Sequence, residues 1–180
     1  MKSIFKLMAL VLVLATTSAQ AGLLVEPVLG FNVNNKLESD GIDTKGIGAS
    51  YGGRLGYQNY GFQLGLDYLA SSIDMDEDSF KNNFKSTDWA AFVGFEFPIL
   101  VRVYAGYIFS AKGEVRTDFG KAKLEGNGTK VGVGFTGLPF IDINLEYRRG
   151  TYDDVKVGGV SADDTDFSSL MLGVSLPLNL

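Results

Sequence analysis

Residues 168–180 alternate in character along their whole length. From Ser168 onward, every second residue is almost always large and apolar: Leu170, Leu172, Val174, Leu176, Leu178 and Leu180. The residues between them are mostly small or polar, which is the period of two expected of a β-strand with one apolar face. A soluble protein needs a second layer of structure against such a face, whereas a membrane barrel needs only lipid. The segment therefore favours a membrane β-barrel over the alternative, an edge strand of a β-sandwich.

The same alternation recurs in seven earlier segments, at residues 23–33, 47–57, 61–71, 87–97, 101–111, 128–137 and 141–149. Short connections at 58–60, 98–100 and 138–140 alternate with long polar connections at 34–46, 72–86, 112–127 and 150–166. Most segments have roughly the 9–11 residues that a tilted transmembrane strand requires. The sequence therefore predicts an all-β fold, an eight-stranded antiparallel up-and-down transmembrane β-barrel with long external loops and short periplasmic turns.

Aromatic residues are segregated toward the two ends of the predicted strands. Those beside the short turns are Tyr57, Phe62, Phe97 and Phe140, and those toward the long connections are Phe31, Tyr68, Trp89, Phe109 and Tyr147. Two aromatic belts at opposite strand ends match the two interfaces of a membrane. A general preference of aromatic residues for strands explains their number but not this segregation.

Residues 1–21 have the pattern of a secretory signal peptide. Lys2 and Lys6 supply the positive n-region, residues 7–15 are continuously apolar, and Ala19-Gln20-Ala21 is a small-x-small cleavage site. The apolar run is shorter than the roughly 20 residues of a spanning helix, so an uncleaved anchor is the weaker interpretation. We therefore expect a signal peptide at 1–21, preceding one barrel domain at 22–180.

Charge and composition exclude several classes of function. Without Lys2 and Lys6 the chain has 14 basic and 21 acidic residues, a formal charge of −7. This balance argues against nucleic acid as a partner, because phosphate binding needs a basic surface. The sequence contains no histidine and no cysteine, which removes Ser-His hydrolases and most zinc catalysis. We therefore predict no enzymatic activity, no catalytic residues, no metal site and no cofactor.

Charged residues fall on the strand face opposite the predicted lipid-facing side chains. This inward set is Glu26, Arg54, Asp67, Asp88, Glu96, Arg102, Lys130, Asp142, Glu146 and Arg148. Charges in so narrow an interior are costly unless they are paired or hydrated. We therefore expect an ion-pair network that joins the four basic residues to Glu26, Asp67, Asp88, Glu96 and Glu146. A filled lumen of this kind suits a structural or surface-interaction protein, whereas pairs that exchange partners would make the alternative, a narrow porin-like channel for ions or small solutes.

The long connections carry two acidic clusters. Residues 74–78 begin like a calcium loop, but Ser79 and Lys85 stand where an EF-hand requires Gly and Glu, so that motif is rejected. The second cluster is Asp153, Asp154, Asp163, Asp164 and Asp166. We interpret both as a hydrated rim, with weak binding of divalent cations near lipopolysaccharide as the alternative.

The chain resembles the small eight-stranded outer-membrane barrels of the OmpA/OmpX type. The resemblance rests on the opening residues 24–30 (Leu-Val-Glu-Pro-Val-Leu-Gly), the Leu-Glu-Tyr-Arg run at 145–148, the loop rhythm and the C-terminal strand. It implies location in the bacterial outer membrane and a monomer surrounded by membrane lipid and lipopolysaccharide. It also implies that the outer-membrane insertion machinery reads the C-terminal signal at Leu172, Val174, Leu176, Leu178 and Leu180. The family usually ends in Phe, so Leu180 departs from the pattern.

Overall fold

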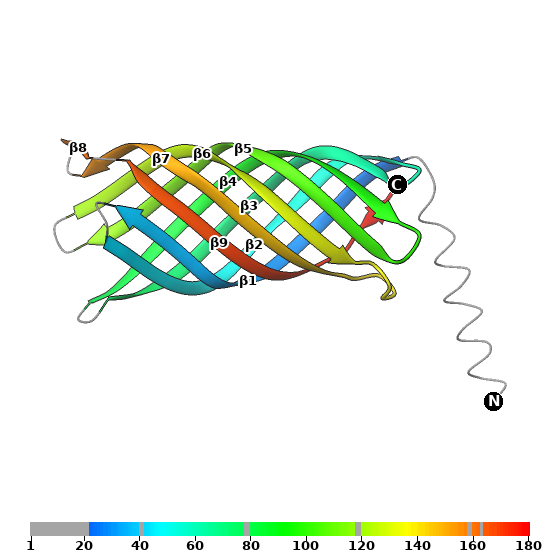
Figure 1. The fold of residues 1–180 in the computed structure, drawn as a ribbon, viewed down its shortest axis with the longest axis horizontal. Coiled ribbons are helices and arrows are strands. Elements are labelled where there is room, and N and C mark those ends of the chain that lie inside the picture. The colour runs from blue at the N-terminus through cyan, green and yellow to red at the C-terminus, as the bar shows by residue number, and fades with distance from the viewer. Residues whose placement is uncertain (1–21, 40–41, 78–79, 118–119, 158–159, 163) are drawn as a thin grey trace, which may run out of the picture.

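The chain forms a single antiparallel sheet that closes on itself into a barrel (Figure 1). The computed structural model of the protein describes residues 22–39, 42–77, 80–117, 120–157, 160–162 and 164–180, so the predicted signal peptide at 1–21 lies outside the described residues. The strands are β1 (Gly22–Ser39), β2 (Ile42–Asn59), β3 (Phe62–Glu77), β4 (Phe80–Phe97), β5 (Val101–Thr117), β6 (Gly120–Phe135), β7 (Asp142–Val157), β8 (Val160–Ala162), β9 (Thr165–Ser175) and β10 (Leu178–Asn179). In this part of the chain, no helix has the length and apolar character needed to cross a membrane.

Eight strands make up the ring. Consecutive strands from β1 to β7 pair as neighbours, and β9 closes the barrel by pairing with both β7 and β1. β8 and β10 continue β9 at its two ends in the same register, and Pro177, which has no N–H to donate, separates β9 from β10. Leu23 and Leu180 exchange backbone hydrogen bonds of 2.9 and 3.0 Å. The predicted eight-stranded antiparallel barrel is confirmed.

The two ends of the barrel differ in their connections (Figure 1). The turns between β2 and β3, β4 and β5, and β6 and β7 lie at one end with the C-terminus, and we call this the short-turn end. The other connections lie at the opposite end, which we call the long-hairpin end.

The strands are longer than the sequence pattern predicts. β1 to β7 contain 16–18 residues each, so most of the four segments predicted as long loops are paired strand. In the segment 34–46, for example, pairing runs from Asn35 opposite Gly46 to Ser39 opposite Ile42. The prediction of loops there is wrong, because the polar residues of these segments lie in paired strands.

The polarity of the two barrel faces reverses along the strands, and β6 shows the reversal clearly. Toward the short turns, Lys130 is buried inside the barrel while Val131 is exposed on its outer wall. Toward the long hairpins, Leu124 is buried inside while Lys123 is exposed. The first pattern suits a wall surrounded by lipid, and the second suits a wall surrounded by water.

Three β-bulges lie in the half of the barrel near the long hairpins. They fall in β1 between Asn32 and Asn35, in β5 between Ile108 and Ala111, and in β7 at Asp153. An extra residue in one strand shifts the facing of every residue beyond it. Only the bulge in β5 lies well inside a predicted strand, and beyond it Ala111 is buried inside the barrel.

Each short turn contains a large residue in the left-handed backbone region. These residues are Tyr60 (φ 48°), Leu100 (φ 64°) and Phe140 (φ 68°). Tyr60 and Gly61 form a two-residue hairpin turn with positive φ at both positions, as a type I′ turn requires. In the next turn Leu100 N–H donates to Phe97 C=O at 3.2 Å, which places Pro98 where a type I turn favours it. A large residue in this region costs about 1–2 kcal/mol relative to the right-handed conformation.

Glycines allow close strand approach at two junctions on opposite sides of the ring. A Cβ atom on Gly52 of β2 would lie 2.0 Å from Tyr68 C=O on β3, and one on Gly126 of β6 would lie 2.0 Å from Thr151 C=O on β7. Glycine within a strand marks a tight bend or a close backbone approach. We infer that the barrel turns sharply at these two junctions.

Candidate functional site

The interior charges begin near the short-turn end with Arg102 of β5. Its guanidinium donates to both carboxylate oxygens of Glu26 on β1, at 2.7 and 3.0 Å, across the lumen. The same group donates to Asn144 Oδ1 at 2.7 Å and lies 3.4 Å from Asp142 Oδ2. Asn144 in turn donates to Ser175 Oγ at 2.8 Å. These contacts join β1, β5, β7 and β9 across the lumen near the short-turn end.

Arg54 of β2 lies at the centre of the network. It donates to Glu26 at 3.2 Å, to Asp67 at 3.0 Å and to Glu146 at 3.0 Å. Its guanidinium carbon lies 4.2 Å from the centroid of the Tyr104 ring, a cation–π contact. The ring has room because it lies over a glycine: a Cβ on Gly132 would be 2.3 Å from Tyr104 Cζ.

Two further cations complete the network toward the long-hairpin end. Lys130 Nζ contacts Asp67 Oδ2 and lies 3.4 Å from Glu146 Oε2. Arg148 contacts Glu146 Oε1 through Nε at 2.6 Å and reaches Asp88 Oδ2 at 2.8 Å. Glu146 therefore holds together three cations, which explains how Lys130 and Arg148 can be directly paired neighbours on β6 and β7.

The structure brings eight of the nine predicted network residues into ion-pair contact: Glu26, Arg54, Asp67, Asp88, Arg102, Lys130, Glu146 and Arg148. All eight side chains are buried. The exception is Glu96, which among the described residues accepts a hydrogen bond from Gln58 Nε2 at 3.4 Å and has no basic partner. Asp142, which the sequence placed in the lumen but not in the network, contacts Arg102 instead.

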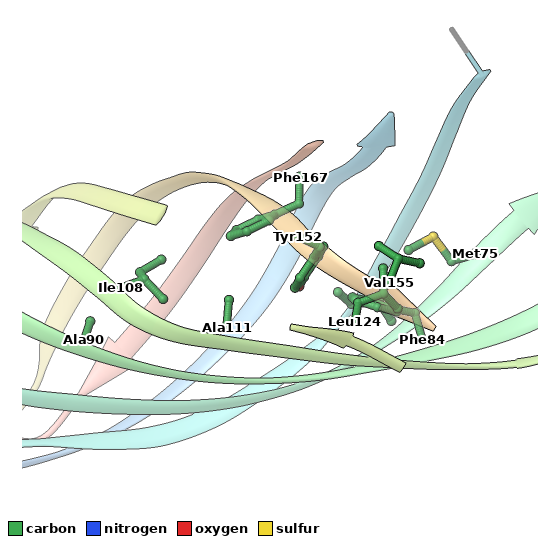
Figure 2. Close-up of a cluster of buried hydrophobic side chains, with 10 residues drawn as sticks. Met75, Phe84, Ala90, Ile108, Ala111, Leu124, Tyr152, Val155 and Phe167 are labelled. Carbon is green, nitrogen blue, oxygen red and sulfur yellow. The ribbon is translucent and has the colours of Figure 1, made fainter. Parts of the chain in front are cut away.

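An apolar layer fills the barrel on the long-hairpin side of the charges. Figure 2 shows its side chains. It consists of Ile73, Met75, Phe84, Ala90, Ile108, Ala111, Leu124, Tyr152, Val155 and Phe167, all buried. The Tyr152 ring lies 4.8 Å from that of Phe167 and 6.4 Å from that of Phe84, measured between centroids. Most of this layer lies in segments predicted as loops, so sequence reasoning missed it. The signal was present as apolar residues at alternate positions, as at 73 and 75.

A small cavity separates the two layers. Its volume is about 30 Å³, enough for one or two water molecules. Asp88 and Arg148 line it on the charged side, and Phe84, Tyr152 and Phe167 line it on the apolar side. The interior is therefore packed on both sides of a narrow gap.

The acidic clusters lie toward the long hairpins. Asp74 accepts a hydrogen bond from Asn83 at 3.1 Å, and Asp166 accepts one from Thr151 at 2.7 Å. Asp153, Asp154 and Asp164 are exposed, whereas Asp78 and Asp163 lie outside the described residues. Where the structure describes side chains, no group of three or more acidic residues is close enough to hold a metal ion.

The residues of the predicted C-terminal signal share the outer face of β9 and β10. They are Leu172, Val174, Leu176, Leu178 and Leu180, all exposed. The intervening Met171, Gly173 and Ser175 are buried. The predicted alternation of this strand is therefore present in the structure, with Met171 packing against Val28 and Leu69 inside the barrel.

A closed barrel with an apolar outer wall and a charged interior defines an integral membrane barrel of the outer-membrane class. The sequence matches the outer membrane protein beta-barrel domain over residues 7–176. The chain belongs to this family, and its location is the bacterial outer membrane.

Two solved structures illustrate the likeness in fold. Neisserial surface protein A is 18% identical, with a TM-score of 0.64, and the match covers 87% of this chain and 98% of that one. Ail, the attachment invasion locus protein of Yersinia pestis, was solved with the heparin analogue sucrose octasulfate; it is 16% identical, with a TM-score of 0.61, and the match covers 87% and 99%. A comparison with curated proteins gave no match.

Proposed function

We propose that this protein is a non-catalytic outer-membrane barrel that acts as a structural or surface-interaction protein. In this proposal the long-hairpin end faces the outside of the cell and the short-turn end faces the periplasm. The paired strands beyond the lipid-facing wall then carry the hairpin tips away from the membrane surface.

The observation that supports this proposal most is that two layers fill the interior, one apolar and one of ion pairs. A solute entering from the long-hairpin end would meet the apolar layer around Tyr152 and Phe84, and behind it the ion pairs of Arg148, Arg54 and Arg102. Opening a path would require separating buried charges from their partners, which costs several kcal/mol for each pair broken. The absence of histidine from the sequence and the pairing of lumen carboxylates with cations favour a structural role for these charges.

The partners in this proposal follow from the surface. Membrane lipid and lipopolysaccharide surround the apolar wall of a monomer, and the insertion machinery reads the outer face of β9 and β10. Nucleic acid is not a partner.

Single-channel recording in planar bilayers tests the proposal against a narrow porin-like channel. The refolded protein is expected to produce no steady conductance steps. A variant in which Phe84→Ala and Tyr152→Ala empty the apolar layer measures whether the ion pairs alone keep the lumen closed. Steady, large open-channel currents from the parent protein would contradict the filled interior and favour the channel.

A further inference from the structure

The tips of the short turns expose large apolar side chains. Tyr60 is 81% exposed, Ile99 75% and Phe140 68%, and the C-terminal Leu180 is 76% exposed. Two of these residues, Tyr60 and Phe140, also occupy the left-handed backbone region, where glycine is free of strain. Exposure of large apolar side chains is unfavourable in water, and glycine at the two strained positions would avoid both costs. The choice of Tyr and Phe there indicates that these side chains meet an apolar medium in the native protein.

No charge interrupts these turns. Residues 55–66, 97–101 and 131–141 contain no Asp, Glu, Lys or Arg. The charged residues that flank the three stretches face the lumen: Arg54, Asp67, Arg102, Lys130 and Asp142 are buried there, and Glu96 accepts a hydrogen bond from the buried Gln58. The long-hairpin end differs, because Lys85, Lys112 and Lys123 are exposed there.

The apolar tips continue the lipid-facing wall without a break. Tyr60 is followed by the exposed Phe62 and Leu64 on β3, and Phe140 by the exposed Ile141 and Ile143 at the start of β7. The three turns and the β9–β1 closure lie at every second strand junction around the closed ring. A fluid lipid layer can cover a surface that surrounds the whole barrel, whereas a single protein partner would cover one side.

We propose that the three short turns and Leu180 form a collar embedded in the phospholipid interface of the membrane, instead of projecting into the aqueous phase. The apolar tips lie among the upper acyl chains and glycerol groups, the zone that aromatic and aliphatic residues share at membrane boundaries. In the orientation proposed above, this is the periplasmic leaflet. The barrel then presents no turn surface on that side for a periplasmic protein.

Tryptophan fluorescence in vesicles tests the collar directly. The sequence has one tryptophan, so Trp89→Phe gives a silent background for Tyr60→Trp, Ile99→Trp and Phe140→Trp, measured one at a time. Leu64→Trp on the lipid-facing wall is the matched membrane control, and Asp153→Trp at the long-hairpin end is the aqueous control. Each variant is refolded into phosphatidylcholine vesicles with acyl chains brominated near the headgroup, and acrylamide is added as the aqueous quencher.

The collar predicts that all three tip tryptophans emit at blue-shifted wavelengths, lose much of their intensity to brominated lipid and resist acrylamide, as Leu64→Trp does. Asp153→Trp is expected to show the reverse. Red-shifted emission with full acrylamide access at the tips would overturn the proposal. Protection from acrylamide without bromolipid quenching would overturn it too and would assign the tips to contacts between copies of the chain.

Cysteine variants provide a second measurement of the surroundings of the tips. The sequence has no cysteine, so Tyr60→Cys and Phe140→Cys can carry a small polarity-sensitive dye if a tryptophan variant does not refold. A dye that reports water at both positions would overturn the collar. A dye that reports an apolar medium at both, and water at Asp153→Cys, would support it.

Discussion

Glu26 shows why single charges in this lumen matter. Its side chain is fully buried and accepts hydrogen bonds from both Arg54 and Arg102. Removing one partner of a buried pair leaves a charge without compensation, which costs more than removing both partners. The stability of the barrel therefore depends on the balance of this network and not on the number of ion pairs.

Arg102→Met should destabilise the protein strongly, by about 3–5 kcal/mol, because Glu26 and Asp142 lose a cation while they stay buried. Adding Glu26→Gln should recover part of that loss. The free energy of unfolding in lipid vesicles, measured with urea for both single variants and the double variant, gives the coupling energy. Strictly additive losses would show that the two side chains do not act as a pair.

At the level of the strand, the sequence predicts best whether a side chain faces the lumen or the outer wall. On β4, Val93 is 64% exposed on the wall, and Gly94 faces the lumen beside Tyr104. Val93→Arg should cost roughly 2–4 kcal/mol if it lies near the membrane midplane. Gly94→Ser should cost far less. Folded yield in lipid, compared between the two variants, measures the difference, and equal losses would mean that the register of β4 is wrong.

Strand glycines at the sharp junctions should be much less tolerant of substitution than their neighbours. Gly52→Ala would press a methyl group against Tyr68 C=O, so we expect a loss of about 1–3 kcal/mol. Gly53→Ala is the matched control, because its Cβ would lie 3.4 Å from the nearest atom, Glu26 C=O. Urea titration of both variants checks the contrast. A neutral Gly52→Ala would indicate that the β2–β3 junction can relax.

Alternation predicted the barrel and the lumen position of Lys130, because a period of two assigns faces directly. It could not predict the strand extensions, since beyond the lipid zone the outer residues, such as Lys123, are polar and give a strand the composition of a loop. It also placed Glu96 in the network and left Asp142 out, whereas in the structure Arg102 contacts Asp142 and Glu96 accepts a hydrogen bond from Gln58. Both face inward, and the choice depends on distances across the lumen that local sequence does not contain.

For the whole molecule, closure of the sheet leads to cooperative unfolding. Among the strands that the structure describes, none in the lipid-facing part of the barrel has a free edge from which pairing can be lost gradually. Unheated and boiled samples in detergent are therefore expected to migrate differently on a gel, with β-sheet circular dichroism in the unheated sample. Identical migration together with a helical spectrum would contradict the fold.

The hydrogen bonds between Leu23 and Leu180 also determine when the protein can assemble. They join residues that lie far apart in the sequence, so the ring cannot close before Leu180 has been synthesised and brought beside Leu23. Closing so long a loop is slow, and during that interval the unpaired edges of β1 and β9 are open to other chains. Pairing of β1 with β9 therefore competes with aggregation during assembly. A catalyst that holds β1 and β9 together would favour closure of the barrel.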